Sequence, residues 1–307
     1  MEKEFVLIID FGSQVTQLIA RRLRELNVYC EIHPFNKVND EFLKKNNPKA
    51  IILSGGPASV LNYNAPKPPL SIYDLEIPIL GICYGQQIMM KMLGGSVVSG
   101  SGTSEFGKSF VKINNKYNNI KLFEGLFLNE GKEEVWMSHG DHVSSIPKDF
   151  EVYGVSENAP FAIIGNEKKR FYGVQFHPEV FHTLNGKVLI KNFLKLSNFS
   201  FNWSMQSYLQ QSLEEIKQKV GDKKVICALS GGVDSSVTAI LINKAIGKQL
   251  TCIYVNNGLM RKKESEEVLN LYREHYNLNL IEANEKNLFL SNLKGVKDPE
   301  KKRKIIG

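Results

Sequence analysis

One cysteine of the chain lies between two glycines. The segment GICYG places Cys83 between Gly81 and Gly85, where an apolar run gives way to a helix-like stretch. This spacing is typical of a nucleophile elbow, a tight strand-to-helix turn that exposes its central side chain. The following helix N-terminus would favour the thiolate, and its amides would hold an oxyanion. A small buried cysteine in a glycine-rich turn is the alternative.

A histidine and a glutamate further along the chain could activate such a thiol. The segment QFHPE (175–179) follows an aromatic strand-like run, FYGV. His177 would take the proton of the thiol, and Glu179 would orient the imidazole and stabilise its charged form. An elbow cysteine together with a downstream His-x-Glu therefore predicts a nucleophile with its base. A histidine that caps a turn before Pro178 is the alternative.

Two other polar segments could serve the same site. SGGP (54–57) follows an apolar run and would supply a second amide for an oxyanion. WMSHGD (136–141) would hold a zwitterionic substrate, with Asp141 facing an ammonium group. Taken alone, each segment is also typical of an ordinary loop. A metal site is not favoured, because the histidines of HGDH lie three residues apart on a glycine-containing loop, without a supporting cysteine or HExxH. The histidines considered for it are His139, His142, His177 and His182.

A loop of small residues in the second half of the chain is typical of anion binding. SGGVDSS lies between the apolar run VICAL and a helix-like stretch, and comprises Ser230, Gly231, Gly232, Val233, Asp234, Ser235 and Ser236. Backbone amides can close around an anion at a helix N-terminus. The loop lacks the lysine of a Walker A motif, which favours binding of pyrophosphate as a leaving group. Asp234 would hold Mg²⁺. An ordinary glycine turn is the alternative.

The elements around these motifs predict an α/β fold with two domains. Apolar runs followed by glycine turns or helical patterns indicate a parallel sheet covered on both faces. The expected strands are 5–10, 50–53 and 77–82, a β-rich region over 105–180, and 225–229, 250–255 and 278–282. The segment 196–203 is typical of a linker. We therefore expect domains at 1–198 and 199–307, the second apparently incomplete.

Composition places the chain among globular proteins. Of 307 residues, 42% are hydrophobic and 23% are charged, and no apolar run approaches the ~18 residues that span a bilayer. The four cysteines form no CxxC pair, which indicates free thiols and a cytoplasmic location. Much of the net charge of +7 lies in 294–307. Nucleic-acid binding is not favoured there, because no aromatic residues are interleaved with the basic ones.

The motifs together resemble known families. GICYGQQ, WMSHGD and VQFHPEV resemble class I glutamine amidotransferases, and SGGVDSS resembles the pyrophosphate loop of N-type ATP pyrophosphatases. With ILSGGPASV and DPEKKRKIIG, their order resembles the glutamine-hydrolysing GMP synthase family over nearly the whole chain. The resemblance implies an amidotransferase-like mixed sheet flanked by helices, then the start of a PP-loop parallel sheet of the adenine nucleotide α-hydrolase type. It also implies a dimerisation domain beyond residue 307, and hence a homodimer.

The resemblance assigns roles to individual residues. Cys83 attacks the side-chain amide of glutamine, His177 transfers the proton and Glu179 orients it. ATP then adenylylates xanthosine monophosphate (XMP), with Mg²⁺ at Asp234, and ammonia displaces AMP to give GMP. Backbone amides near Gly56 and Tyr84 match the oxyanion hole, and the positions around glutamine match Gln87, Ser138, His139 and Asp141. The pyrophosphate loop matches Ser230–Ser236, and Val255 borders the adenine.

Two departures and three alternatives remain at this point. Asn256 and Ser104 stand where the family commonly has Asp and Arg. The alternatives are a chain that acts only as a glutaminase, a PP-loop sulfur-transfer enzyme acting on tRNA, and a non-catalytic nucleotide-binding module. A sulfur-transfer enzyme would need catalytic cysteines beside the SGGVDSS loop, whereas Cys227 and Cys252 lie inside apolar strands. We expect the chain to hydrolyse glutamine and to make little or no GMP.

Overall fold

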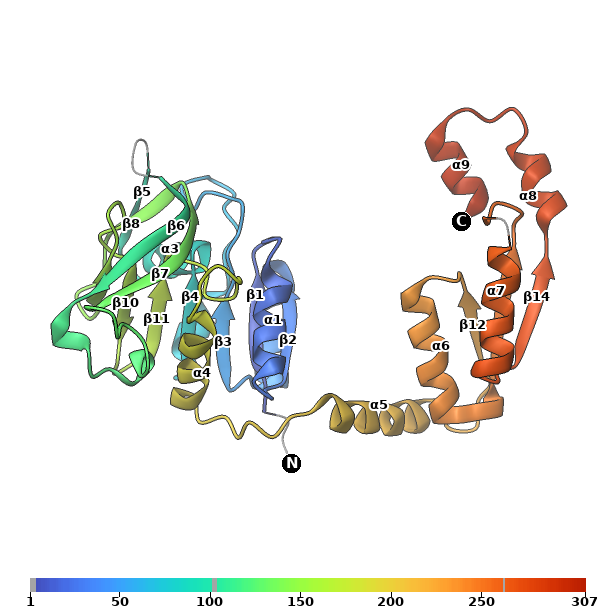
Figure 1. Ribbon diagram of the computed structural model, residues 1–307, viewed down its shortest axis with the longest axis horizontal. Coiled ribbons are helices and arrows are strands. Elements are labelled where there is room, and N and C mark those ends of the chain that lie inside the picture. The colour runs from blue at the N-terminus through green and yellow to red at the C-terminus, as the bar shows by residue number, and fades with distance from the viewer. Residues whose placement is uncertain (1–3, 101–103, 262) are drawn as a thin grey trace. The chain divides into compact units, whose positions relative to one another are not determined.

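The chain divides between Ser204 and Met205 into two units, each of which is described by itself (Figure 1). The structure, a computed structural model, describes residues 4–100, 104–261 and 263–307. The segment before the division is held by the first unit, because Ser200 Oγ donates to Glu4 Oε2 (2.8 Å) and Trp203 N donates to Asn27 O (3.0 Å). This segment, which the sequence suggests is a linker, is therefore part of the first unit.

A nine-stranded mixed sheet forms the centre of the first unit, in the order β2-β1-β3-β4-β11-β10-β9-β6-β7. The strands from β2 to β11 in that order are parallel, and the later neighbours are antiparallel. The bounds are β1 Val6–Asp10, β2 Cys30–Pro34, β3 Ala50–Leu53, β4 Ile79–Ile82, β6 Glu105–Ile113, β7 Lys132–His139, β9 Glu151–Val155, β10 Ile163–Asn166 and β11 Phe171–Val174. A separate two-stranded ribbon pairs β5 (Ser96–Ser99) with β8 (Asp141–Ser145).

Helices cover both faces of this sheet, as the apolar strands require. The helices α1 (Thr16–Glu25) and α4 (Gly186–Leu196) bury side chains in one hydrophobic core, and α2 (Asp40–Asn46) and α3 (Tyr84–Met92) bury theirs in the other. Short 3₁₀ turns lie at Phe35–Lys37, Leu70–Asp74, Asn115–Tyr117 and Lys121–Phe123. The predicted α/β class and mixed sheet are confirmed for this unit.

The pairing of β4 with β11 brings two distant segments together. Gly81 lies opposite Gly173 in this parallel pair, and Ile82 lies opposite Val174. The backbone contact continues past the strands, because Cys83 N donates to Val174 O (2.8 Å). Residues that follow the two strands must therefore meet at the same edge of the sheet, which is where ligands bind in parallel α/β sheets.

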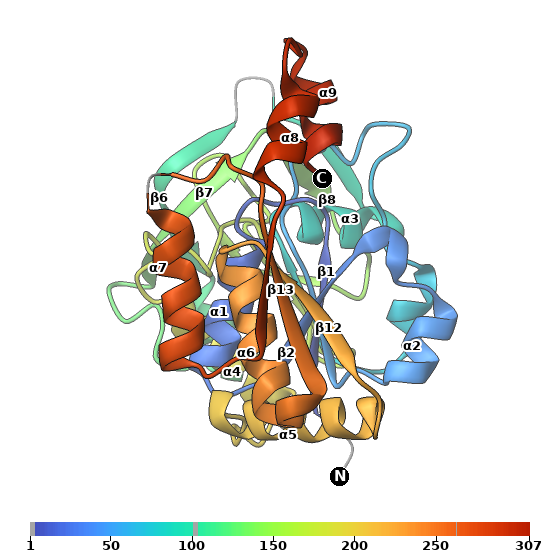
Figure 2. The ribbon, with the colours of Figure 1, turned by 90° about the vertical axis from the view of Figure 1, so that its right-hand side faces the viewer.

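A three-stranded parallel sheet, β12-β13-β14, forms the second unit and confirms the predicted start of a parallel sheet (Figure 2). Its strands are β12 Val225–Leu229, β13 Leu250–Asn256 and β14 Leu280–Asn284. Its helices are α5 Met205–Val220, α6 Val233–Ile246, α7 Glu264–Asn270, α8 Lys286–Leu293 and α9 Pro299–Ile306, with a 3₁₀ turn at Gly247–Gln249 and a π-helical turn at Leu271–His275. Among the described residues, no helix is long and apolar enough to cross a membrane.

The apolar run VICAL forms a strand that is buried on one face only. Leu229 and Cys252 point into the core of the second unit, whereas Ile226 is 71% exposed and Ile281 is 53% exposed. Side chains alternate between the two faces of a strand, and α6 covers the face that carries Leu229. Cys227 lies on that covered face but is only half-buried.

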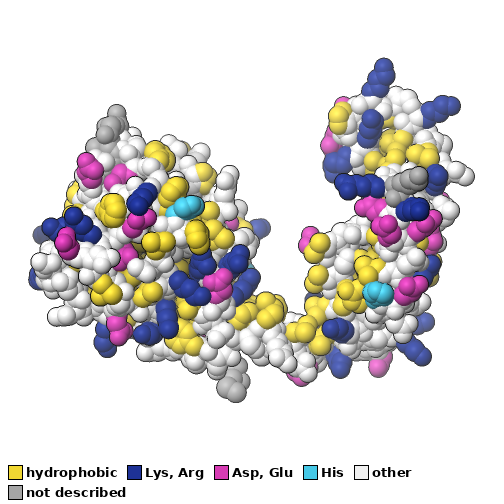
Figure 3. Space-filling view, viewed as in Figure 1, with side chains coloured by type: hydrophobic (Ala, Val, Ile, Leu, Met, Phe, Trp, Pro, Cys, Tyr) yellow, Lys and Arg dark blue, Asp and Glu magenta, His cyan; other side chains and the backbone are white. Residues whose placement is uncertain are grey.

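The basic residues near the end of the chain lie on a surface helix. Figure 3 shows Lys and Arg side chains gathered over the α8 and α9 region. Asp298 caps α9 by accepting from Lys301 N (2.8 Å), and Arg303 pairs with Glu300 (2.7 Å). This pairing is typical of a solvated helix face.

Candidate active site

Cys83 occupies a sharp turn between β4 and α3. It is the N-cap residue of α3, with φ 51° and ψ −108°, a conformation that a non-glycine residue rarely adopts. The two flanking glycines are sterically required. A Cβ on Gly85 would overlap the carbonyl oxygen of Leu53, and a Cβ on Gly81 would lie 2.7 Å from Gln86 N. The spacing in the sequence therefore produces the predicted elbow geometry, with the helix N-terminus at the thiol.

His177 and Glu179 lie beside this turn and are buried. His177 Nδ1 is 2.8 Å from Glu179 Oε1, and the Glu179 side chain is 0% exposed. Burial by itself lowers the pKa of His177, but hydrogen bonds with the Cys83 and Glu179 side chains, together with their charges, outweigh it and raise that pKa to about 10. His177 is thus hydrogen-bonded to Glu179 and lines the same cavity as Cys83, and its raised pKa favours the imidazolium next to the Cys83 sulfur.

The loop that carries His177 is fixed by backbone contacts on both sides. His177 N donates to Trp136 O (3.0 Å), and Thr183 Oγ1 donates to His177 O (2.7 Å). Thr183 Oγ1 also accepts from Trp136 N (3.0 Å). Arg22 Nε donates to the carbonyl of Glu179 (3.0 Å). These contacts tie the His177 loop to β7 and α1, so that the imidazole is held in place before any ligand arrives.

A cavity of about 300 Å³ opens beside the thiol, at the lower end of the range for small-molecule sites. Cys83, His177, Gly56, Ser138 and Trp136 are among its lining residues. The Ser138 carbonyl accepts from Cys83 Sγ at 3.6 Å. A Cβ on Gly56 would lie 2.9 Å from Phe11 O, so this position also requires glycine.

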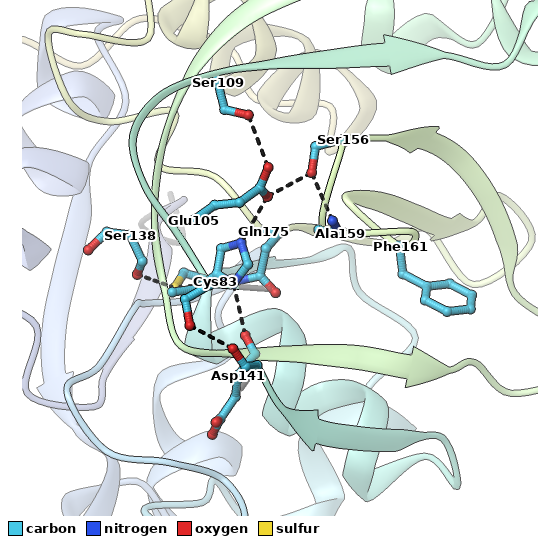
Figure 4. A network of polar contacts seen from close by, with 12 residues as sticks. Cys83, Glu105, Ser109, Ser138, Asp141, Ser156, Ala159, Phe161 and Gln175 are labelled. Carbon is cyan, nitrogen blue, oxygen red and sulfur yellow. Dashed lines mark hydrogen bonds and ion pairs between the residues drawn. The ribbon is translucent and has the colours of Figure 1, made fainter. Parts of the chain in front are cut away.

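The remaining residues that the sequence assigns to the glutamine site lie outside the lining of this cavity. Gln87 Nε2 donates to the Asp141 carbonyl (2.7 Å), which also lies 3.1 Å from His139 Nδ1. The Asp141 carboxylate accepts from Ser59 Oγ. Tyr84 begins α3 next to the thiol, with its side chain packed on Phe11. These four residues therefore lie within the protein around the Cys83 turn rather than in the cavity; Figure 4 shows Asp141 there.

Several residues of this network are not identified from the sequence. Buried Glu105 lies 3.1 Å from His139 Nε2 and accepts from Ser156 Oγ (2.7 Å). Burial raises the pKa of Glu105, but hydrogen bonds from His139, Ser156 and Ser109 outweigh it, and its pKa falls below the usual range. Glu105 is 34 residues from His139 along the chain, so only the pairing of β6 with β7 brings the two together.

The loop Ser230–Ser236 connects β12 to the first turn of α6. Gly231 has φ 80°, and Gly232 is the N-cap of the helix. Ser230 Oγ accepts from Gly232 N (3.3 Å) and lies 3.0 Å from Ser235 Oγ. Ser236 Oγ donates to Gly232 O (2.7 Å). The hydroxyls thus link the loop to the start of α6, a 14-residue helix whose N-terminus favours an anion.

The carboxylate suggested for Mg²⁺ stands in the first turn of α6, where Asp234 is exposed. Within 4–100, 104–261 and 263–307, no cluster of three His, Cys, Asp or Glu side chains could hold a metal ion. Mg²⁺ commonly takes one or two carboxylates and completes its shell with phosphates and water, so a lone Asp234 fits such a role. Two further residues lie on the next strand, β13. Val255 is 41% exposed near its end, and Asn256 Oδ1 accepts from Gly258 N (3.1 Å).

The fold and the site together define the first unit as an α/β protein with a Cys-His-Glu series on a strand-to-helix turn. Residues 7–196 match the family described as "Glutamine amidotransferase class-I", and the chain belongs to that family. Residues 205–301 match the family described as "NAD synthase". The resemblance to class I amidotransferases inferred from the sequence is confirmed.

Individual relatives extend the likeness over both units. The chain is 62% identical over 302 residues to a protein of Dinoroseobacter shibae named "GMP synthase [glutamine-hydrolyzing]", and 59% identical over 302 residues to one of the same name from a Ruegeria species. Each match covers 98% of this chain but 58% of the relative, so the chain spans little more than half of these proteins. The crystal structure of a Thermoplasma acidophilum protein described as a GMP synthase subunit, 27% identical, superimposes with a TM-score of 0.53 over 69% of this chain and 99% of that one.

Proposed function

We propose that the first unit is a glutaminase, with Cys83 as nucleophile, His177 as general base and Glu179 as the residue that orients the imidazole. The observation that carries this proposal is the placement of Cys83, on a strand-to-helix turn, in one cavity lining with His177, whose imidazole is hydrogen-bonded to the buried Glu179. Membership of the class I amidotransferase family supports glutamine as the substrate.

The chemistry follows from the positions of these groups. The Cys83 thiol gives its proton to His177, and the thiolate attacks the side-chain amide carbon of glutamine. Backbone amides near Gly56 and Tyr84 stabilise the resulting oxyanion. His177 returns the proton to the leaving nitrogen, and ammonia departs while a γ-glutamyl thioester remains on Cys83. Water then hydrolyses the thioester to glutamate and restores the thiol.

Gln87, Ser138, His139 and Asp141 form the surroundings of the bound glutamine in this proposal. Ser138 lines the cavity directly. Gln87 and His139 act from behind by fixing the backbone at Asp141. The Asp141 side chain is half-buried and already has a partner in Ser59. The Asp141 carboxylate would therefore attract the α-ammonium group of the glutamine by its negative charge rather than by a direct hydrogen bond.

We propose further that the chain belongs to a glutamine-hydrolysing GMP synthase, a ligase of purine biosynthesis, as the names of its relatives suggest. ATP would transfer AMP to the C2 oxygen of xanthosine monophosphate, and ammonia from the first unit would displace that AMP to give GMP. Ser230–Ser236 would hold the departing pyrophosphate at the start of α6. Asp234 would be one ligand of a Mg²⁺ ion that neutralises charge on the phosphates, and Val255 would border the adenine.

The alternatives weighed from the sequence find less support. Sulfur transfer by a PP-loop enzyme would need reactive cysteines at the loop, whereas Cys252 is buried in a strand, where burial raises its pKa to about 11. A purely structural nucleotide-binding module would not account for the Cys83 series. We propose that the enzyme acts in the cytoplasm as a homodimer.

The test measures ammonia and glutamate formed from glutamine by the wild-type chain, by Cys83→Ala and by Cys30→Ala. Cys30 is a matched control, because it is a buried thiol of the same unit and donates instead to the Ala20 carbonyl (3.7 Å). We expect the activity to disappear in Cys83→Ala and to persist in Cys30→Ala. Activity that survives in Cys83→Ala would remove the basis of the proposal.

A further inference from the structure

A glutamine that has no assigned role contacts the sulfur of Cys83. Gln175 follows β11, two residues before His177, and is 1% exposed. Its Nε2 lies 3.6 Å from Cys83 Sγ, and its Oε1 accepts from Gln87 Nε2 at 3.2 Å. Figure 4 shows Gln175 next to Cys83.

The hydrogen bonds of the neighbours fix which end of the Gln175 amide faces the sulfur. The Asp141 carbonyl can only accept, so the group 2.7 Å away from it must be the NH₂ of Gln87. That same NH₂ faces Gln175, which must therefore turn its oxygen toward Gln87. The NH₂ of Gln175 is left to point at Cys83 Sγ. The orientation is thus set by the network rather than by the amide itself.

We propose that Gln175 is a further catalytic residue of this site, which stabilises the thiolate of Cys83 by donating an N–H to its sulfur. The value of a stabilised thiolate rests on the proposed glutaminase function, whereas the experiment below measures the thiol itself and does not depend on that function. A donor strengthens its hydrogen bond when the acceptor becomes charged, so the N–H favours the thiolate over the thiol. When the S–H bond breaks, the proton goes to the ring nitrogen of His177 that is not bonded to Glu179.

Other charged groups near the sulfur also affect how readily the Cys83 thiol loses its proton. His177, which pairs with Glu179, lines the same cavity as the thiol. Asp141, His139 and Glu105 are linked to Gln87 through the Asp141 carbonyl, which accepts from Gln87 and lies beside His139, and His139 pairs with Glu105. A variant that removes only the N–H, and keeps the oxygen that accepts from Gln87, therefore separates the effect of the donor from the effect of this network.

The experiment measures the rate at which iodoacetamide alkylates Cys83 as a function of pH, with the Cys83 peptide resolved by mass spectrometry. Gln175→Met keeps the length of the side chain and removes the donor. Gln86→Met is the matched control, since Gln86 is equally buried and adjacent to the same turn but donates to the Phe161 carbonyl (2.7 Å). We expect Gln175→Met to move the alkylation midpoint upward by about one pH unit, which slows alkylation about tenfold below the midpoint. Gln86→Met should keep the wild-type midpoint.

A second variant keeps the proposal testable if Gln175→Met does not fold. Gln175→Glu retains the oxygen that accepts from Gln87 but places a carboxylate oxygen at the sulfur, so we expect its midpoint to rise at least as far. A wild-type midpoint in either folded variant would overturn the role of Gln175. The assay contains no glutamine, so a failure of glutamine hydrolysis would count against the proposed function and leave this result unaffected.

Discussion

Replacing Glu179 by glutamine tests how the imidazole of His177 is kept charged. Glu179 Oε1 lies 2.8 Å from His177 Nδ1, and the carboxylate is fully buried. Within the described part of the chain, its second oxygen is buried without a hydrogen-bond partner. The hydrogen bond to the imidazole therefore accounts for most of the stabilisation that this carboxylate receives. Glu179→Gln preserves the shape of the side chain and removes its charge.

The expected effect is a large loss of activity with a shifted pH profile. A hydrogen bond between charged groups contributes about 1.5–3 kcal/mol, which corresponds to a roughly 10- to 150-fold fall in kcat/KM for glutamine hydrolysis. The charge of Glu179 also helps to raise the pKa of His177 to about 10. Without it that pKa falls, so the imidazolium that pairs with the thiolate is lost at lower pH. The alkaline limb of the profile should move toward neutral pH.

The assay follows glutamate release from pH 6.5 to about 10, the interval between the ordinary and the raised pKa of His177. Glu31→Gln is the matched control. Glu31 also lies two residues from a histidine and pairs with it, since its carboxylate is 3.1 Å from His33 Nε2, but it is partly exposed and stands on the edge strand β2, three strands away from β4, which leads to Cys83. We expect the control to match wild type. A Glu179→Gln enzyme within about twofold of wild type, with an unmoved alkaline limb, would refute the reasoning.

Three further outcomes follow from the structure. Gly85→Ala would press a methyl group onto the Leu53 carbonyl, and we expect it to destabilise the first unit by about 1–3 kcal/mol in calorimetry; an unchanged Tm would contradict the steric argument. Because the pKa of His177 is raised from 6.5 to about 10 in the folded state, its contribution to stability is complete below pH 6.5 and is lost as the pH rises through about 10. Urea unfolding at pH 6.5 and at about pH 10 should show a larger fall in the free energy of unfolding for wild type than for His177→Asn. Equal falls in the two proteins would be inconsistent with a raised pKa of His177. Ser230→Ala removes the hydroxyl that holds Gly232 N, and we expect about tenfold weaker pyrophosphate binding by calorimetry; wild-type affinity would argue against the loop as the anion site.

Much of the positioning of the thiol can be predicted from short-range sequence patterns. The elbow depends on glycines two residues away on either side, and Glu179 depends on its position two residues after His177, so the chain itself supplies the geometry. The predicted strand 50–53 has the bounds that the structure gives it. The expected strand 278–282 lies instead at Leu280–Asn284, because strand ends are set by pairing with the neighbouring strand rather than by composition.

The parts that cannot be predicted depend on contacts between distant segments. The strand Cys30–Pro34 is not among the expected strands, because Glu31 and His33 interrupt any apolar run and the strand lies at the edge of the sheet. The support of Asp141 by Gln87 requires the ribbon β5–β8 to pack beside α3, which no local pattern encodes. The exposure of Ile226 likewise depends on which face of β12 is covered by helices. Side-chain networks that join separate elements are therefore visible only in three dimensions.

The most direct test of the proposed chemistry is to trap the covalent intermediate. The chain would be mixed with radiolabelled glutamine and quenched in acid within the first turnovers, and the label would be located by peptide mass spectrometry. We predict a γ-glutamyl group on the peptide that contains Cys83, absent from Cys83→Ala and released by base as expected of a thioester. Ammonia release with the label on another residue, or on none, would contradict the assignment of Cys83 as the nucleophile.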